Sequence, residues 1–565
     1  MSQARSQGDT ATPATNSAPQ IADPALQAAN SAPHEADSVP LGADSGSPSA
    51  HSASPGADSA SRGADSARPG AGEAAGSIPQ GAKGEPKAAR QGGNAAPVDS
   101  TQVYALSLEV GTQQRAQADG LESVREGRLK VYDPAQDNAA RFVELLRSRL
   151  TRSLLVSFEG CVHCGLCAEA CHYVLTHPDD PTMVPAWKAD QVRRVFKRHV
   201  DWTGRLAPWF VHALHPTTDA ELNRLKNVVF GSCSACRRCT FNCPMGVDNA
   251  ALIRFARGIL TELGIVPEGV FNVSRDQWET GNQMAVTEQD YLETIEWVQE
   301  ELQVEMDDPS FRIPVEVEGC DFVYTLNPRE VKFDPRSLSN AAKVFHYAGE
   351  SWTLPRTGWD QTNFGLFSGD DRLGGFVARN AYESAARLRA RRLVISECGH
   401  GYRSTRWEGY NWAGVDQTLP TESVVVTLQR YLREGRIKVD PSRNPEAVTF
   451  HDSCNIARSG DLVEQPREVL RQVCADFREM TPHGRENYCC TGGSGLLSMA
   501  EYRPLRMEAA RIKAEQLRAT GAKLVCTMCH NCVDGLGDVI KHYRLDMKVV
   551  QVLDLVAQAL VIPPR

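Results

Sequence analysis

The pattern of apolar positions divides the chain into three regions: one without apolar periodicity, one with helical periodicity, and one of short apolar runs alternating with helices. In the second region, residues 142–154 carry an apolar side chain at every fourth position: Phe142, Leu146, Leu150 and Leu154. This spacing predicts an amphipathic helix. Residues 248–264 predict another helix, which Asp248 can cap and Gly264 can end.

The third region, from about residue 310, alternates strands with helical sequence such as 376–390 and 504–519. The predicted strands are Leu393–Ser396, Ala447–His451 and Lys523–Val525, followed by Cys398, Cys454 and Cys526 respectively. Ligands of open α/β sheets gather beyond the carboxyl ends of the strands. We therefore expect these three cysteine loops to converge on one crevice.

Residues 1 to about 100 consist almost entirely of Ala, Gly, Ser, Pro and Asp, with Gly-Ala-Asp-Ser at 42–45, 56–59 and 63–66. Such a segment cannot bury enough apolar surface to offset the entropy of ordering. The predicted fold class is thus α+β multidomain. A disordered tail over 1–100 precedes an all-helical domain over 101–310 and an α/β cysteine-rich domain over 311–565.

The formal net charge of -9 and the lack of a basic stripe argue against a nucleic-acid partner. The first residues have no apolar segment typical of a secretory signal, and no stretch is apolar enough to span a membrane. These features predict a cytoplasmic protein, with or without a membrane-bound partner. Its 17 cysteines would then be reduced and available to bind metal.

Eight cysteines form two copies of the pattern Cys-x-x-Cys-x-x-Cys-x-x-x-Cys: Cys161, Cys164, Cys167 and Cys171, then Cys233, Cys236, Cys239 and Cys243. This is the ferredoxin pattern for two 4Fe-4S clusters, in which the fourth cysteine of each run binds the other cluster. It predicts one site from Cys161, Cys164, Cys167 and Cys243, and a second from Cys233, Cys236, Cys239 and Cys171. His172 replaces the usual proline, and we interpret it as a local backbone variation because the cysteine set is complete without it.

A second constellation comprises Cys454, the pair Cys489-Cys490, and Cys526-x-x-Cys529. Disulfide scaffolds suit short secreted chains, and a zinc site needs only four ligands. An adjacent cysteine pair does not easily reach one tetrahedral ion. A metal cluster is therefore the leading interpretation.

With Glu397-Cys398-Gly399-His400-Gly401-Tyr402-Arg403, these motifs resemble the cysteine-rich CCG domain of heterodisulfide reductases, and more specifically the DsrK family of catalytic subunits of membrane-bound DsrMKJOP complexes. Thr491 stands where the name-giving glycine usually follows the doublet. The resemblance implies two cubane 4Fe-4S clusters and one noncubane-type catalytic 4Fe-4S cluster. Implied partners are a haem-b, quinone-reactive DsrM-like membrane subunit, the other DsrMKJOP subunits, and a DsrC-like sulfur-carrier protein as substrate.

The related domains often carry two tandem cysteine halves, but here the first half keeps only Cys398. We expect one catalytic cluster, with Cys398 as an additional ligand or sulfur-handling thiol, or else an ordinary buried cysteine. Cys532 is the alternative to Cys526. His400, His451 and His530 each lie beside a site cysteine, and any one can be the proton donor or a structural histidine.

The implied reaction is reduction of the disulfide or trisulfide of the carrier protein with electrons exchanged with the quinone pool, or the reverse oxidation. Two other classes of function remain open. The chain can be the iron-sulfur subunit of a flavin-dependent dehydrogenase of 2-hydroxyacids or glycerol 3-phosphate. Alternatively, it is an electron-relay subunit without a substrate of its own.

Overall fold

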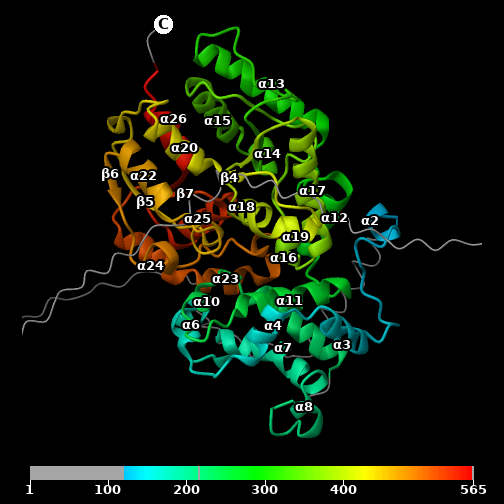
Figure 1. Cartoon of the computed structure of the whole chain (residues 1–565). Coiled ribbons are helices and arrows are strands. Elements are labelled where there is room, and N and C mark those ends of the chain that lie inside the picture. Colours follow the sequence, from blue (N-terminus) through cyan, green and yellow to red (C-terminus); the bar gives the residue numbers. More distant parts are fainter. Residues whose placement is uncertain (1–119, 214–216, 563–565) are drawn as a thin grey trace, which may run out of the picture. The chain divides into compact units, whose positions relative to one another are not determined.

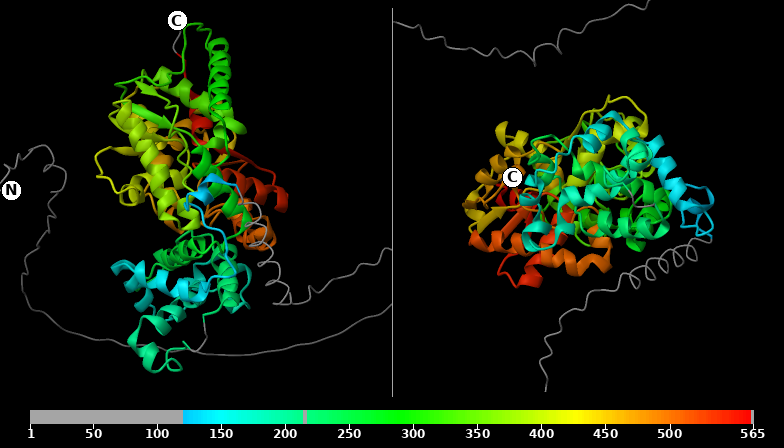
Figure 2. Two further views of the ribbon diagram at one scale, coloured as in Figure 1. Left: turned by 90° about the vertical axis from the view of Figure 1, so that its right-hand side faces the viewer. Right: turned by 90° about the horizontal axis from the view of Figure 1, so that it is seen from below.

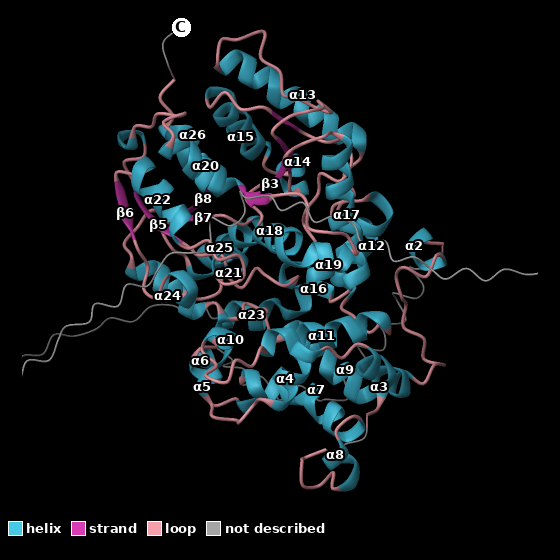
Figure 3. Cartoon of the chain, viewed as in Figure 1, coloured by secondary structure: helices cyan, strands magenta, loops and turns pink. Residues whose placement is uncertain are grey.

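The computed structural model describes residues 120–213 and 217–562, a helical module followed by two parallel sheets (Figures 1 and 3). These residues belong to one compact unit of the chain. The tail predicted to be disordered lies outside the described residues. Within those residues, no helix has the length and apolar character that a membrane span requires.

Between residues 120 and 310, the described part of the chain contains helices and loops but no strand. They are α2 (Glu122–Arg125), α3 (Asn138–Ser148), α4 (Arg152–Glu159), α5 (Leu166–Glu169), α6 (His172–Thr176), α7 (Pro185–His199), α8 (Trp202–Leu206), α9 (Asp219–Lys226), α10 (Arg238–Phe241), α11 (Asn249–Glu262), α12 (Glu268–Thr280) and α13 (Glu288–Glu305). Helix α11 has the predicted ends: Asp248 accepts a hydrogen bond from the backbone N–H of Ala251 (3.0 Å), and Gly264 has a φ of +68°.

The single helix predicted through Phe142 and Leu154 is wrong, because the structure has two helices there. Helix α3 ends at Ser148, and Thr151 starts α4 by accepting a hydrogen bond from the backbone N–H of Leu154 (3.3 Å). A threonine side chain that caps a new helix interrupts the old one without changing the apolar spacing. The periodicity alone therefore hid the break.

The first sheet contains β1 (Phe322–Thr325), β2 (Trp352–Thr353), β3 (Arg392–Ile395) and β4 (Thr421–Ser423), in the order β2-β1-β3-β4 with all pairs parallel. Its helices are α14 (Pro328–Lys332), α15 (Pro335–Tyr347), α16 (Gly365–Ser368), α17 (Asp371–Arg387), α18 (Gly399–Arg403), α19 (Gly409–Ala413) and α20 (Val424–Arg433).

The second sheet contains β5 (Ala447–Phe450), β6 (Asp476–Arg478), β7 (Leu524–Thr527) and β8 (Lys548–Gln551), in the order β6-β5-β7-β8, again all parallel. Its helices are α21 (Cys454–Ala457), α22 (Glu464–Val473), α23 (Arg503–Ala509), α24 (Arg511–Ala519), α25 (His530–Tyr543) and α26 (Val552–Ala559).

The two sheets have the same strand order when each is numbered from its own first strand. They share one hydrophobic core, in which β1 and β3 of the first sheet join β5 and β7 of the second. The predicted fold class, a helical module followed by an α/β domain, is confirmed. Because the topology repeats, the α/β domain consists of tandem halves.

Candidate metal centres

The first ferredoxin-type set lies around a hollow between α5 and the loop before α11. Its lining includes four thiols that come from both cysteine runs: Cys161, Cys164, Cys167 and Cys243. Gly165 turns the chain here with a φ of +86°, a left-handed conformation that favours glycine. The structure thus brings together the four side chains predicted for one site.

The second set lines a separate hollow and consists of Cys171, Cys233, Cys236 and Cys239. None of the described cysteines is in a disulfide. Four free thiols at each hollow fit the donor set of a 4Fe-4S cluster. His172 does more than vary the backbone, because its hydrogen bond to Cys236 helps to lower the pKa of that thiol, after the larger effect of Cys489.

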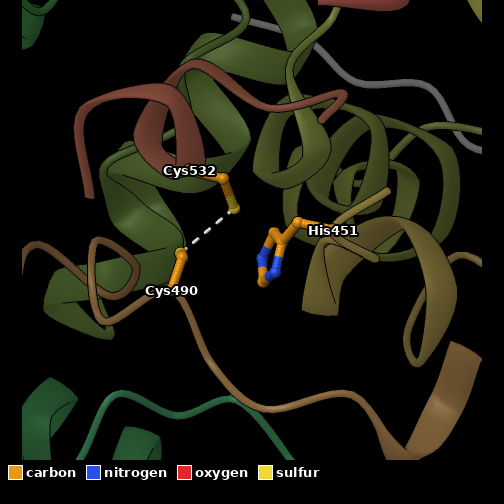
Figure 4. A group of neighbouring side chains, drawn as sticks. All are labelled: His451, Cys490 and Cys532. Carbon is orange, nitrogen blue, oxygen red and sulfur yellow. Dashed lines mark hydrogen bonds between the residues drawn. The ribbon is translucent and has the colours of Figure 1, made fainter. Parts of the chain in front are cut away.

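Five thiols gather where the loops of the second sheet meet the second ferredoxin-type set. They are Cys454 at the start of α21, Cys489 and Cys490 in the loop before α23, and Cys529 and Cys532 at the start of α25. The sulfurs of Cys490 and Cys532 are 3.1 Å apart, and the ring of His451 faces them (Figure 4). All five cysteines are buried.

Hydrogen bonds between neighbouring thiols shape the electrostatics of this group. The bonds from Cys489 and then Cys532 hold the pKa of Cys490 well below its usual range. Cys489 has a raised pKa, chiefly because it is hydrogen-bonded to Cys236. The pKa of Cys529 is lowered by its bond to Cys532 and, to a smaller extent, by His400. A continuous row of sulfurs therefore runs from the ferredoxin-type module into the α/β domain.

Cys526 does not lie in this group. The predicted strand was too short, since β7 continues through Cys526 to Thr527. Inside the strand, the thiol of Cys526 is fully buried, and burial raises its pKa, with smaller effects from Glu397 and Cys474. The alternative that the sequence left open, Cys532, occupies the position beside Cys490.

Thr491 follows the cysteine doublet with a φ of +62°, in the left-handed region where glycine is favoured. Its backbone N–H donates to the sulfur of Cys489 (3.2 Å). This conformation gives a physical reason for the glycine usually found at the position. Threonine adopts it here at some cost in strain.

Cys398 lies at the edge of the thiol group. Its sulfur is 3.5 Å from Nδ1 of His400, and burial raises its pKa, with a further contribution from Cys529. Asn327, which follows β1, donates to Cys398 (3.8 Å). In the second half, the loop after the equivalent strand β5 leads to Cys454, whereas the loop after β1 carries Asn327 and no cysteine.

The three candidate histidines have different surroundings. His400 contacts Cys398 and Cys529, and its ring packs on Phe367. Burial and Lys513 lower the pKa of His451, which lies beside Cys490. His530 is paired with the buried Glu330 (3.0 Å); burial alone would lower its pKa, but this hydrogen bond raises it.

Two buried cations near the thiols were not predicted from the sequence. Arg458 donates to the carbonyls of Cys236 (2.7 Å), Arg485 (2.8 Å) and Asn487 (2.9 Å). Lys513 donates to Oδ1 of Asn487 (2.8 Å), whose amide in turn donates to Nδ1 of His451 (3.2 Å). Burial lowers the pKa of Lys513 to about 7. Neither residue lies in a cysteine motif, so only the fold reveals them.

A cleft of about 730 Å³ leads to Cys454 from the surface between the helical module and the first sheet's helices. Six arginines and four carboxylates line it, together with Phe367, Trp412 and Ser494. Arg403 lies next to Cys454 and is held by Glu408 (2.7 Å) and by Asn455 (3.4 Å). The volume is in the usual range for ligand pockets.

Comparisons with known proteins agree with this geometry. Residues 157–247 match the 4Fe-4S dicluster domain, and residues 448–536 match the cysteine-rich CCG domain. Among similar proteins is the Hdr-like menaquinol oxidoreductase iron-sulfur subunit of Archaeoglobus profundus, 25% identical over 73% of this chain and 81% of the relative. A subunit of the dihydromethanophenazine:CoB--CoM heterodisulfide reductase of Methanosarcina mazei is 25% identical over 73% of this chain and 96% of its own length.

The dicluster match contains all eight ferredoxin-type cysteines, and the CCG match contains the five thiols that gather beside the second sheet. The similarity to the two relatives extends over most of the described residues. The chain therefore contains a 4Fe-4S dicluster domain followed by a CCG domain, and over most of its length it is similar to iron-sulfur subunits of heterodisulfide reductase-like proteins.

Proposed function

We propose that this chain is the catalytic subunit of a membrane-associated complex that reduces the disulfide or trisulfide of a DsrC-like carrier protein, or catalyses the reverse oxidation. One observation carries the proposal: five thiols converge between the second ferredoxin-type set and the inner end of a cleft. A pure relay subunit would not need such a cleft. The names of the relatives support a link to the quinone pool.

Three cofactors fit the thiols. Cys161, Cys164, Cys167 and Cys243 would hold one cubane 4Fe-4S cluster, and Cys171, Cys233, Cys236 and Cys239 the other. Cys454, Cys489, Cys490, Cys529 and Cys532 would hold the noncubane-type 4Fe-4S cluster. When bound, the clusters would supply one at a time the two electrons that cleavage of an S–S bond requires.

The protein's own residues have distinct roles in this proposal. The cleft would admit the S–S group, and Arg403 would orient an anionic part of the substrate beside Cys454. His400 would donate a proton to the departing thiolate, because it contacts both Cys529 and Cys398. Neither Cys398 nor His400 lines the cleft, so His400 would act from the side of the thiol group, with Cys398 supporting its position.

The proposed complex includes a haem-b, DsrM-like membrane subunit that exchanges electrons with quinone, and the other DsrMKJOP-type subunits. The chain would lie on the cytoplasmic face of the inner membrane. Electrons would pass through the two cubane sites to the site that the five thiols form. The hydrogen bond between Cys489 and Cys236 supports this route, because it joins the second cubane site to that group.

The reaction is tested by electron paramagnetic resonance of the anaerobically purified chain, with and without an oxidised DsrC-like protein. We expect a signal that changes on addition of this substrate, and we expect Cys489→Ser to remove that signal while leaving both cubane signals. Spectra that show cubane clusters alone and do not respond to a disulfide would refute the proposal.

Arg403→Gln is expected to raise the KM for the carrier protein by about 10- to 100-fold, because the cleft loses its cation beside Cys454. Steady-state kinetics with an artificial electron donor measure this change. Arg406→Gln, on the next turn of the chain, is the matched control. A fall in kcat with unchanged KM would instead place Arg403 outside substrate binding.

A further inference from the structure

Four large apolar side chains are exposed within nine residues around α8. The exposed fractions are 71% for Trp202, 71% for Leu206, 65% for Trp209 and 79% for Phe210. Among the other exposed apolar residues that the structure describes, Val304 and Phe333 stand singly, and Leu155 (37%) with Val156 (60%) form a smaller aliphatic pair. We call Trp202, Leu206, Trp209 and Phe210 the aromatic tip. A concentrated apolar patch on a protein surface indicates an interaction site.

The aromatic tip is held in a fixed position and is not a loose loop. Gly204 of α8 lies so close to α7 that a Cβ at this position would collide with the carbonyl of Lys197. Asp201 caps α8 by accepting from the N–H of Thr203 (2.9 Å) and is itself paired with Lys197 (2.8 Å). The ribbon at α8 projects beyond α7 in Figure 1, and the same blue-green segment lies at the lower end of the molecule in the left view of Figure 2.

Positive charge surrounds the base of the tip. Arg147 and Arg205 both donate to the carbonyl of His199, and Arg198 is exposed at the end of α7. Burial lowers the pKa of His199, and these three guanidinium groups lower it further. Among the described residues, Arg198 and Arg205 form no ion pair with a carboxylate. The charge therefore remains available to an anionic partner.

We propose that the aromatic tip and its three arginines bind directly to the surface of a bilayer that contains anionic lipids. Tryptophan and phenylalanine favour the headgroup region, and arginines next to it add attraction to anionic headgroups. The arginines without carboxylate partners around the aromatic rings match the charge of anionic headgroups, and binding to a protein instead is an outcome that the test below distinguishes. The inference does not depend on the reaction proposed above.

The geometry also relates this surface to the metal centres. Helix α7 begins at Pro185, next to the hollow of Cys161 and Cys167, and has 15 residues. At 1.5 Å per residue, it separates the tip from that hollow by about 22 Å. Binding at the tip would thus hold the first ferredoxin-type set near the membrane surface.

The test is co-sedimentation of the full chain with vesicles of phosphatidylcholine alone and with phosphatidylglycerol added. We expect binding to the anionic vesicles, with a blue shift of tryptophan fluorescence. The triple variant Trp202→Ser, Trp209→Ser, Phe210→Ser should reduce the partition coefficient by about tenfold or more. Arg198→Gln with Arg205→Gln should abolish the preference for anionic lipid.

The matched control is Phe333→Ser with Trp297→Ser, which removes exposed aromatic rings from α13 and the end of α14 and should leave binding unchanged. The cubane signals in electron paramagnetic resonance verify that each variant is folded. Equal binding by the wild type and the triple variant would overturn the proposal. So would a wild type that ignores vesicles while the triple variant loses its membrane subunit, since the tip would then bind protein.

Discussion

Replacing Cys532 with alanine is expected to abolish the catalytic cluster and reduce disulfide reduction by more than about 100-fold. Replacing a residue that only supports a metal ligand typically lowers metal affinity or activity about 10- to 100-fold. Cys532 would be a ligand itself, so its loss should cost more. Its sulfur lies 3.1 Å from Cys490 and is hydrogen-bonded to Cys529. Iron content, electron paramagnetic resonance and turnover of the purified variant measure the effect, with both cubane signals retained.

Cys526→Ala provides the matched control, because Cys526 is the residue that the motif spacing favoured. Its thiol is buried in β7 away from the other sulfurs, so the variant should keep all cluster signals and activity. Loss of this small buried side chain should cost about 1 kcal/mol in the free energy of unfolding. The opposite pattern, with cluster loss in Cys526→Ala alone, would restore the assignment made from the sequence.

Arg458→Met is expected to lower the free energy of unfolding by about 3–5 kcal/mol and the rate of disulfide reduction by at least about tenfold. The variant leaves the carbonyls of Cys236, Arg485 and Asn487 without the donor that joins them. These carbonyls belong to the loops that carry Cys236 and Cys489. Their separation would move the relay site away from the catalytic thiols.

Chemical denaturation and stopped-flow reduction measure the two effects of Arg458→Met. Arg458→Lys should recover only some of the stability, since one ammonium cannot reach three carbonyls as a guanidinium does. Arg511→Met, which removes an exposed arginine paired with Glu515, should leave both quantities unchanged. If Arg458→Met reduces substrate at the wild-type rate, the two loops do not depend on this contact.

The eight ferredoxin-type cysteines could be grouped from the sequence, because short runs of fixed spacing carry their own geometry. The long-range group could be predicted only in outline. Its last members depend on where β7 ends, and a strand end is set by pairing with β5 and β8 more than by local residue type. Because β7 ends two residues later than predicted, Cys526 lies inside the strand and Cys532 takes its place in the thiol group.

The break between α3 and α4 and the burial of Arg458 and Lys513 could not be predicted from the apolar pattern. Thr151 looks like any polar residue in the apolar repeat, and only its hydrogen bond to Leu154 marks a helix start. Arg458 and Lys513 are charged residues that local sequence places on a surface. Their burial follows from the packing of loops far apart along the chain, which no periodicity records.

The repeated sheets suggest a division of labour between two copies of one structural unit. The second copy keeps the thiols, whereas the first has an asparagine and a single cysteine at the corresponding loops. The first copy instead supplies Phe367, Arg403 and Trp412 to the cleft wall. Because it holds no thiol set of its own, the first copy would be free to determine which substrate reaches the thiols of the second.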